Sequence, residues 1–135
     1  LSDIQKLKSG QSIESPTYSY ITCTRQEETV RVEPKKILII EGILIYTCRQ
    51  LCDEINMRIY LEVDADHRLS RIIERDMESR GRTAQDVIER YYKTVRPMYE
   101  EFIRPSRREA DMLVVGGGLN VAAAEFISSA IAGKL

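Results

Sequence analysis

Residues 36–42, Lys-Ile-Leu-Ile-Ile-Glu-Gly, constrain the fold of this chain more than any other segment. Four consecutive branched apolar residues at 37–40 predict a strand that is buried on both faces, as the strands of parallel sheets are. Residues 57–63 and 111–115 predict two further strands, and helical patterns lie between them. Strands that alternate with helices predict an α/β fold built on a parallel sheet.

The helical segments are marked by apolar periodicity and by their end signals. Apolar spacing predicts helices over residues 67–79, from residue 84 onward, and over residues 121–131. Gly81 is expected to break the first of these, and residues 83–86, Thr-Ala-Gln-Asp, resemble a capping box with Asp in the place of Glu. Pro97 is expected to interrupt or restart the second helix, and Pro105 to end the helical region.

The first third of the chain predicts a short helix followed by a β-hairpin. Residues 1–9 have the pattern of a helix end that is closed by Gly10 in a left-handed conformation. Residues 16–22 are rich in β-formers and residues 29–32 alternate, so we expect an antiparallel hairpin whose polar turn lies at residues 25–28.

Composition limits the class of protein. A chain of 135 residues fits a single domain, residues 1–135, and a net charge of −1 gives no reason to expect nucleic acid or a membrane surface as a partner. With three cysteines and one histidine, neither a disulfide scaffold nor a zinc site is expected. These features favour a cytoplasmic protein with reduced cysteines.

Glu41 is the first candidate for chemistry. It follows the predicted buried strand directly, and ligands of open α/β sheets bind at the carboxyl ends of strands. A carboxylate there can hold Mg²⁺ directly or through water, and Gly42 allows a close backbone approach. An ordinary solvated glutamate at the end of a strand explains the pattern equally well.

A set of arginines on and after the helix at 67–79 is the second candidate. Guanidinium groups stay charged and bind phosphate as a fork, so a mobile segment that carries them can stabilise the charge of a transferring phosphoryl group. Acidic residues at 74, 76 and 78 lie among the arginines, so a solvated helix face is the alternative. The set comprises Arg68, Arg71, Arg75, Arg80 and Arg82.

Aromatic residues of the hairpin are the third candidate. Tyr18 and Tyr20 are two residues apart and share a face, close to Cys23 and Arg25, so they could stack on a base or a sugar. The pattern alone favours the alternative, in which they pack the hairpin onto the domain. No nucleotide-binding fingerprint accompanies these candidates, because neither GxGxxG nor GxxxxGK[ST] occurs in the sequence.

Together, these and neighbouring segments resemble the uridine kinase (uridine/cytidine kinase) family of P-loop nucleoside kinases, in order and spacing across nearly the whole chain. The segments that carry the resemblance are Pro-Thr-Tyr-Ser-Tyr at 16–20 with Thr-Arg at 24–25, Glu-Gly-Ile-Leu at 41–44, Asp-Ala-Asp at 64–66 with Arg-Leu-Ser-Arg at 68–71, Arg-Asp at 75–76, Arg-Gly-Arg at 80–82, Tyr91, Thr-Val-Arg-Pro-Met at 94–98 and Ala-Asp at 110–111.

The resemblance implies a fold and an activity. The fold is the C-terminal part of a parallel-sheet P-loop kinase with a β-hairpin insertion and a helical lid. The activity is transfer of a phosphoryl group from ATP or GTP, with Mg²⁺, to the 5′-hydroxyl of uridine or cytidine in pyrimidine salvage. We expect nucleosides and nucleotides as partners, and a homo-oligomer.

Residue roles follow from the same resemblance. Glu41 belongs to the Mg²⁺ environment and to catalysis, and the arginines at 75, 80 and 82 contact phosphates and substrate as part of a lid. Tyr18 and Tyr20 line the nucleoside pocket. Cys23 stands where the family often has a histidine, and Arg90 aligns with a glutamine that reads the base. Both are expected to contact substrate, and these two departures leave the base preference open while keeping the nucleoside kinase class. Residues 115–117, Val-Gly-Gly, replace a more usual Pro-Arg-Gly.

The phosphate-binding loop and the catalytic aspartate of the family precede the position that matches Leu1. We therefore expect the 135 residues to be a fragment without kinase activity of its own. A related kinase such as phosphoribulokinase, a non-catalytic module that keeps the nucleoside pocket or an oligomer surface, and a structural piece that associates through an exposed sheet edge are the alternatives.

Overall fold

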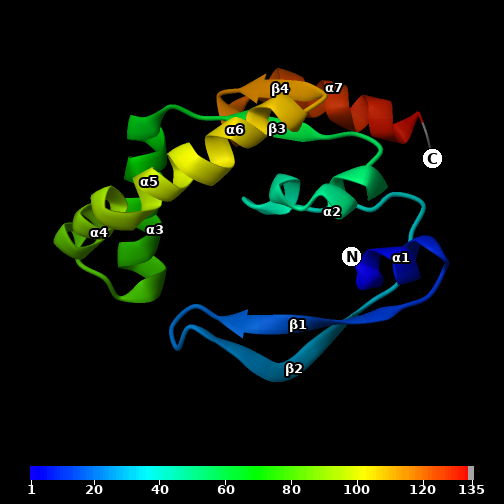
Figure 1. The fold of residues 1–135 in the computed structure, drawn as a ribbon, viewed down its shortest axis with the longest axis horizontal. Helices are drawn as coiled ribbons and strands as arrows, with labels where there is room; N and C mark the ends of the chain where they lie inside the picture. Colours follow the sequence, from blue (N-terminus) through cyan, green and yellow to red (C-terminus); the bar gives the residue numbers. More distant parts are fainter. Residues whose placement is uncertain (134–135) are drawn as a thin grey trace. The chain divides into compact units, whose positions relative to one another are not determined.

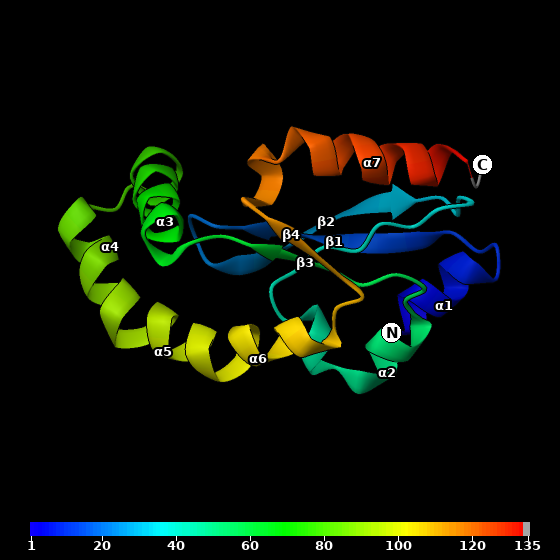
Figure 2. The ribbon, with the colours of Figure 1, turned by 90° about the horizontal axis from the view of Figure 1, so that it is seen from above.

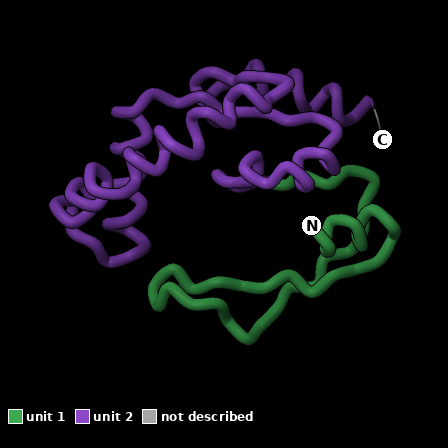
Figure 3. The backbone as a smooth tube through the Cα atoms, viewed as in Figure 1, with its two compact units in different colours: residues 1–40, 135 green, residues 41–134 purple. Residues whose placement is uncertain are grey.

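A computed structural model describes residues 1–133 of the chain (Figure 1). These residues divide into two units (Figure 3). Unit 1 comprises residues 1–40, and unit 2 begins at Glu41 and includes the rest of the described chain. The sheets follow the same division, because one two-stranded sheet lies in each unit.

Unit 1 contains a helix and a hairpin, as the sequence predicts. Helix α1 (Ser2–Lys8) is followed by Gly10 at φ 84°, the left-handed conformation expected after a helix end. Strands β1 (Ile13–Ser19) and β2 (Thr24–Val32) pair antiparallel, with Ile13 opposite Val32 and Ser19 opposite Thr24. A bulge interrupts the ladder between Pro16 and Tyr18.

The predicted turn at residues 25–28 is wrong, since these residues belong to β2 and the turn lies at residues 20–23. The side chain of Ser19 accepts a hydrogen bond from the Thr22 amide at 3.2 Å, and Cys23 adopts φ 55° to reverse the chain. The sequence Arg-Gln-Glu-Glu at 25–28 suggested a turn because turns are usually polar. Most of β2 is exposed, so its polar residues are compatible with a strand.

The sheet of unit 2 confirms two of the predicted strands. Strands β3 (Ile59–Glu62) and β4 (Met112–Val115) pair in parallel, with Ile59 opposite Met112 and Glu62 opposite Val115. Just before both strands, Asp111 accepts hydrogen bonds from the backbone amide and guanidinium of Arg58, at 2.8 to 3.2 Å. This charged pair sets the register at the amino ends of the two strands.

The strand predicted at residues 36–42 is not formed. The segment has no regular secondary structure, and Ile39 is 77% exposed. A buried strand needs hydrogen-bonding partners at its edges, and within residues 1–133 only β1 with β2 and β3 with β4 form such pairs. The chain continues into the 3₁₀ turn η1 (Ile45–Thr47) and helix α2 (Arg49–Glu54). Tyr46 of η1 donates a 2.7 Å hydrogen bond to the carbonyl of Ile59 and so joins η1 to β3.

Two helices after β3 form an adjacent pair (Figure 1). Helix α3 (Ala65–Arg80) ends at Gly81, whose φ of 62° is left-handed as its position requires. Helix α4 (Ala84–Arg90) begins with the predicted capping box: Thr83 accepts from the Asp86 amide, and Asp86 accepts from the Thr83 amide. Both helix ends are therefore set by local chemistry.

The helical region continues through both prolines, which corrects the prediction that Pro105 ends it. Beyond α4 lie η2 (Tyr91–Val95), α5 (Arg96–Met98), η3 (Tyr99–Ile103), α6 (Arg104–Ser106) and η4 (Arg107–Glu109), which follow one another as a curved arc in Figure 2. Segments η2 and η3 are π-helical and directly precede the turns with Pro97 and Pro105. A wider π turn relieves the clash between a proline ring and the carbonyl four residues earlier, so the helix bends instead of stopping.

The C-terminal part closes unit 2. Strand β4 leads through Gly116 and the 3₁₀ turn η5 (Gly117–Leu119) to helix α7 (Val121–Ala132), which Asn120 caps by accepting a hydrogen bond from the Ala123 amide. The buried apolar residues of unit 2 lie in α2, β3, α4, η2 and β4 and are Cys52, Tyr60, Val87, Tyr91 and Val114. The α/β class with a small parallel sheet is confirmed.

Candidate functional site

Asp76 of α3 is the centre of a cluster of four arginines. The carboxylate is 1% exposed. Its Oδ1 atom lies 2.8 Å from Arg75 Nη2 and 3.1 Å from Arg80 Nη1. Its Oδ2 atom lies 2.8 Å from Arg82 Nη1 and 3.7 Å from Arg90 Nη1. We call these five residues the Asp76 cluster. It brings together the four arginines to which the family resemblance gave a role in the site.

The local fold explains why the arginines converge. Arg80 lies one helical turn after Asp76, the spacing at which side chains of a helix meet. Arg75, the residue before Asp76, reaches the carboxylate through its Nε and Nη2 atoms. The left-handed turn at Gly81 brings the Arg82 amide to within 3.2 Å of the Asp76 carbonyl. Arg90 approaches from the end of α4. The cluster therefore ties the end of α3 to the turn and to α4.

The charges around Asp76 keep it ionised. Burial alone would raise the pKa of Asp76, but hydrogen bonds from Arg75 and Arg82 and the positive charges of Arg75 and Arg80 outweigh burial, so this pKa lies below the ordinary aspartate value. With four guanidinium groups and one carboxylate, the cluster carries an excess of three positive charges. An anion such as a phosphate is the ligand that this excess favours.

Arg68 and Arg71 lie on the same helix but take part in other contacts. The guanidinium of Arg68 stacks 3.4 Å from the centre of the Tyr99 ring, and the Tyr99 hydroxyl lies 3.3 Å from the Tyr60 hydroxyl. A methyl group added to Gly117 would lie 3.7 Å from Arg71 Nη1. Arg68 therefore faces the curved helical region from η2 to η4, residues 91–109, which we call the helical arc, and Arg71 faces the segment after β4. Neither arginine is part of the Asp76 cluster.

The aromatic residues of the hairpin form a second surface, in unit 1. Tyr18 and Tyr20 make an edge-to-face pair with ring centres 5.2 Å apart, and they are 51% and 61% exposed. Cys23 is exposed at φ 55°, an uncommon conformation for a residue with a side chain, and its thiol lies 3.6 Å from the Tyr20 carbonyl.

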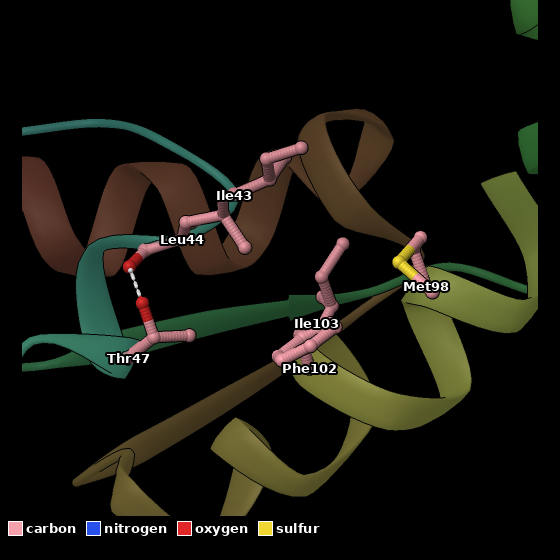
Figure 4. A pocket seen from close by; sticks show the side chains of 6 residues that line it. All are labelled: Ile43, Leu44, Thr47, Met98, Phe102 and Ile103. Carbon is pink, nitrogen blue, oxygen red and sulfur yellow. Dashed lines mark hydrogen bonds between the residues drawn. The ribbon is translucent and has the colours of Figure 1, made fainter. Parts of the chain in front are cut away.

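Glu41 is exposed and begins unit 2, where it follows an irregular segment instead of a strand. Beyond it lies an apolar groove of about 440 Å³. Figure 4 shows its lining: Ile43, Leu44 and Thr47 on one side, and Met98, Phe102 and Ile103 of the helical arc on the other. The Glu-Gly-Ile-Leu segment thus meets the helical arc through its apolar residues, while its carboxylate stays in solvent.

Two features of the described residues bear on a hard cation: Glu41, which the family resemblance assigns to Mg²⁺, and one acidic cluster at the start of α3. Glu41 supplies one exposed carboxylate, which fits Mg²⁺, since proteins hold this ion through one or two carboxylates together with substrate phosphates. At the start of α3, ligand atoms of Asp64, Asp66 and His67 lie within 4.8 Å of one another, and all three residues are exposed. The second group includes an imidazole, which suits Mg²⁺ less well.

Comparison with known proteins decides the family. Residues 1–122 match the model of the "Phosphoribulokinase / Uridine kinase family". The chain belongs to this family. It is similar to the uridine kinases of Salmonella paratyphi B and Salmonella newport, each 47% identical over 128 residues, which is 95% of this chain and 60% of the relative. It is also 46% identical to the uridine kinase of Escherichia fergusonii over 131 residues, or 97% of this chain and 62% of the relative.

The chain therefore spans about 60% of the length of the curated relatives that it matches. The resemblance to the uridine kinase family is confirmed, and so is the α/β class of the family fold. Among the described residues, no helix combines the length and the apolar character that a bilayer crossing requires.

Sequence reasoning missed the residue that organises the site. Asp76 was counted among the acidic residues that make a helix face soluble, yet it is the buried centre of the cluster. Its position one residue after Arg75, four before Arg80 and six before Arg82 is a signal that could have identified it. Tyr99 and Tyr60 gave no signal, because their contact with Arg68 depends on tertiary packing.

Proposed function

We propose that the whole protein transfers a phosphoryl group from ATP or GTP to the 5′-hydroxyl of uridine or cytidine. The observation that carries this proposal is the Asp76 cluster, an excess of three positive charges on a helical pair in a chain of the phosphoribulokinase and uridine kinase family. The relatives that match over 95% of the chain are named uridine kinases, which supports a nucleoside over a sugar phosphate as the acceptor.

The arginines act on the phosphates. The guanidinium groups of Arg75, Arg80 and Arg82 neutralise charge on the donor phosphates and on the transferring phosphoryl group. A guanidinium group is not a nucleophile, so these residues form no covalent intermediate. The left-handed Gly81 between Arg80 and Arg82 is the position about which this helical lid turns toward the phosphates. Catalysis then rests on positioning and electrostatic stabilisation.

The hairpin binds the nucleoside. The exposed edge-to-face pair of Tyr18 and Tyr20 offers ring surfaces to the base and ribose, and Cys23 lies at the adjoining turn. Arg90, half exposed at the end of α4, contacts the substrate from the cluster. At these two positions a thiol and a guanidinium replace an imidazole and an amide of the family pattern, so the choice between uracil and cytosine has to be measured with uridine and cytidine side by side.

Mg²⁺ would be held by Glu41, directly or through water. When bound, this ion neutralises phosphate charge and orients the donor. The carboxylate of Glu41 is exposed, so it is accessible to a hydrated ion that accompanies the nucleotide.

The 135 residues alone are proposed to be inactive as a kinase. Their sequence contains no GxxxxGK[ST] loop, the backbone cradle that P-loop kinases use for the donor phosphates. Purified chain with ATP, Mg²⁺ and uridine is therefore expected to form no uridine monophosphate above background. Measurable turnover by the chain would contradict this part of the proposal.

A chimera tests the activity directly. The part of the Salmonella newport uridine kinase that this chain does not match is joined to the 135 residues, and ADP formation is measured with uridine, cytidine or ribulose 5-phosphate. We expect turnover with the nucleosides and none with the sugar phosphate. A folded chimera that uses only the sugar phosphate would reassign the acceptor, and one that uses none of the three would favour a non-catalytic module.

Variants of this chimera separate binding from transfer. Replacing Arg80 by Gln is expected to lower kcat, because its charge acts on the transferring group. Replacing Tyr18 by Ala is expected to raise KM for the nucleoside. Arg49→Gln, an exposed arginine of α2 outside the cluster, is the matched control and should leave both constants unchanged.

The remaining parts of the proposal concern partners and location. We propose that the protein acts in the cytoplasm on nucleosides and nucleotides, binds neither nucleic acid nor membranes, and self-associates. Sedimentation over a hundredfold range of concentration tests self-association, and a constant monomer mass would contradict it.

A further inference from the structure

The buried carboxylate at the centre of the Asp76 cluster has no role in the proposed function so far. We propose that Asp76 is a positioning residue, which holds the guanidinium groups of Arg75, Arg80, Arg82 and Arg90 together as a preformed site for phosphoryl groups. The inference rests on the proposed function, because it takes the arginines as the phosphate ligands.

The geometry divides the arginines between the two oxygens of Asp76. Oδ1 accepts from Arg75 Nε at 2.9 Å and Nη2 at 2.8 Å, and Arg80 Nη1 lies 3.1 Å away. Oδ2 accepts from Arg82 Nη1 at 2.8 Å and lies 3.7 Å from Arg90 Nη1. One carboxylate therefore anchors arginines from α3, from the turn after it and from α4.

Electrostatics make this anchor necessary. Four guanidinium groups within 4 Å of one point repel one another, and their long side chains can separate into solvent by changing rotamers. The negative charge of Asp76 offsets part of that repulsion and supplies hydrogen bonds of fixed direction. An anion then meets guanidinium groups that are already in place and need little further ordering.

The carboxylate of Asp76 and the arginines around it differ in burial. Asp76 is 1% exposed and is covered, whereas the side chains of Arg75 and Arg90 are 53% and 49% exposed. Each guanidinium has five N–H groups, and Arg75 directs its Nε and one Nη2 hydrogen bond at Asp76. Solvent-facing N–H groups remain on Arg75 for a phosphate oxygen.

A substitution that removes the charge distinguishes positioning from competition. Asp76→Asn raises the excess charge of the cluster from three to four. If Asp76 only competed with an anion for the arginines, Asp76→Asn would bind polyphosphate more tightly. If Asp76 positions them, the variant binds more weakly in spite of its added positive charge. The two roles therefore predict changes of opposite sign.

The experiment is calorimetric titration of the 135-residue chain with inorganic tripolyphosphate at low salt. We expect wild-type chain to bind and Asp76→Asn to bind roughly tenfold more weakly, the size of one charge-assisted hydrogen bond. Asp76→Glu, which keeps the charge, is expected to recover part of the affinity. Equal or tighter binding by Asp76→Asn would overturn the role of Asp76.

A matched variant controls for loss of helix packing. Val87 of α4 is 2% exposed and carries no charge, so Val87→Ala loosens the pair of α3 and α4 without touching the cluster. We expect it to melt at a lower temperature and to keep the wild-type affinity. If it loses as much affinity as Asp76→Asn, packing alone explains the effect and the inference fails.

If the wild-type chain does not bind tripolyphosphate, the phosphate role of the arginines fails too. Turnover by the chimera tests the kinase proposal separately.

A measurement on the wild-type chain needs no folded variant. The Nε–H proton of Arg75 donates to Asp76, so its exchange with water should be slowed relative to that of Arg108, an exposed arginine of η4. Nuclear magnetic resonance of the arginine side chains gives both rates. Equal exchange rates for Arg75 and Arg108 would show that the cluster is not held in place.

Discussion

Gly117, two residues after the end of β4, is the glycine at which an added methyl group is expected to cost most. Its φ is 60°, and a Cβ atom built on it would lie 2.6 Å from Val63 Cγ2. Val63 follows β3, and its β-branched side chain has little rotamer freedom with which to move away. Gly117→Ala therefore combines backbone strain with a steric clash at the carboxyl end of the parallel sheet.

The magnitude follows from these two contributions. An alanine in the left-handed region costs about 1–2 kcal/mol, and overpacking against a stiff neighbour costs about 1–3 kcal/mol. The free energy of unfolding should thus fall by about 2–5 kcal/mol. Gly116→Ala is the matched control, because Gly116 has φ 80° but nothing within 4 Å of its added Cβ atom, so only the backbone contribution of about 1–2 kcal/mol applies.

Urea unfolding followed by far-ultraviolet circular dichroism measures the difference. With a slope of about 2 kcal/mol per molar urea, the midpoint of Gly117→Ala should lie roughly 0.5–1.5 M below that of Gly116→Ala. Adding Val63→Ala should restore part of the loss in Gly117→Ala, because it removes the clashing Cγ2 atom. Equal midpoints for the two glycine variants would refute the steric reasoning.

Three further predictions concern α3, α4 and the helical arc. Thr83→Ala removes the capping box shared with Asp86 and should lower the free energy of unfolding by about 1 kcal/mol in the same urea assay; an unchanged midpoint would argue against the cap. Tyr99→Leu removes the ring beneath Arg68 and should cost about 1–2 kcal/mol, with Tyr99→Phe losing less because it keeps the ring; equal losses for both would assign the effect to the hydroxyl. The pKa of Asp76 is lower in the folded than in the unfolded chain, so its contribution to stability is complete above the unfolded pKa of about 3.9 and is lost as pH falls through the folded pKa. Asp76→Asn should flatten the acid side of the stability profile, and an acid side as steep as that of wild type would contradict the assigned pKa shift.

Much of the fold could be predicted because its signals are local. The capping box at Thr83 and the left-handed Gly81 are set by contacts within a few residues, and both were predicted. The strands β3 and β4 were also predicted from their apolar runs. The arginines were singled out by residue type and spacing, and the family resemblance assigned them to phosphate.

Three other features could not be predicted: the missing strand at residues 37–40, the position of the hairpin turn and the continuation of the helix past Pro105. Each depends on distant strand partners or on which of two compatible local structures forms. Residues 37–40 have the composition of a buried strand, but strand formation depends on partners at both edges. The hairpin turn was misplaced because charge at residues 25–28 is compatible with an exposed strand as well as with a turn. Pro105 was expected to stop a helix that a π turn allows to bend.

The sequence by itself determined the family, the order of helices and strands after residue 57, and the presence of arginines suited to phosphate, because each depends on residue identity and local spacing. Tertiary structure decided which of those arginines lie together. Arg75, Arg80, Arg82 and Arg90 meet at Asp76, while Arg68 of the same helix turns to Tyr99. The physical reason is burial: a carboxylate withdrawn from water must find positive partners, and only the packing of α3 against α4 determines that Asp76 is the one withdrawn.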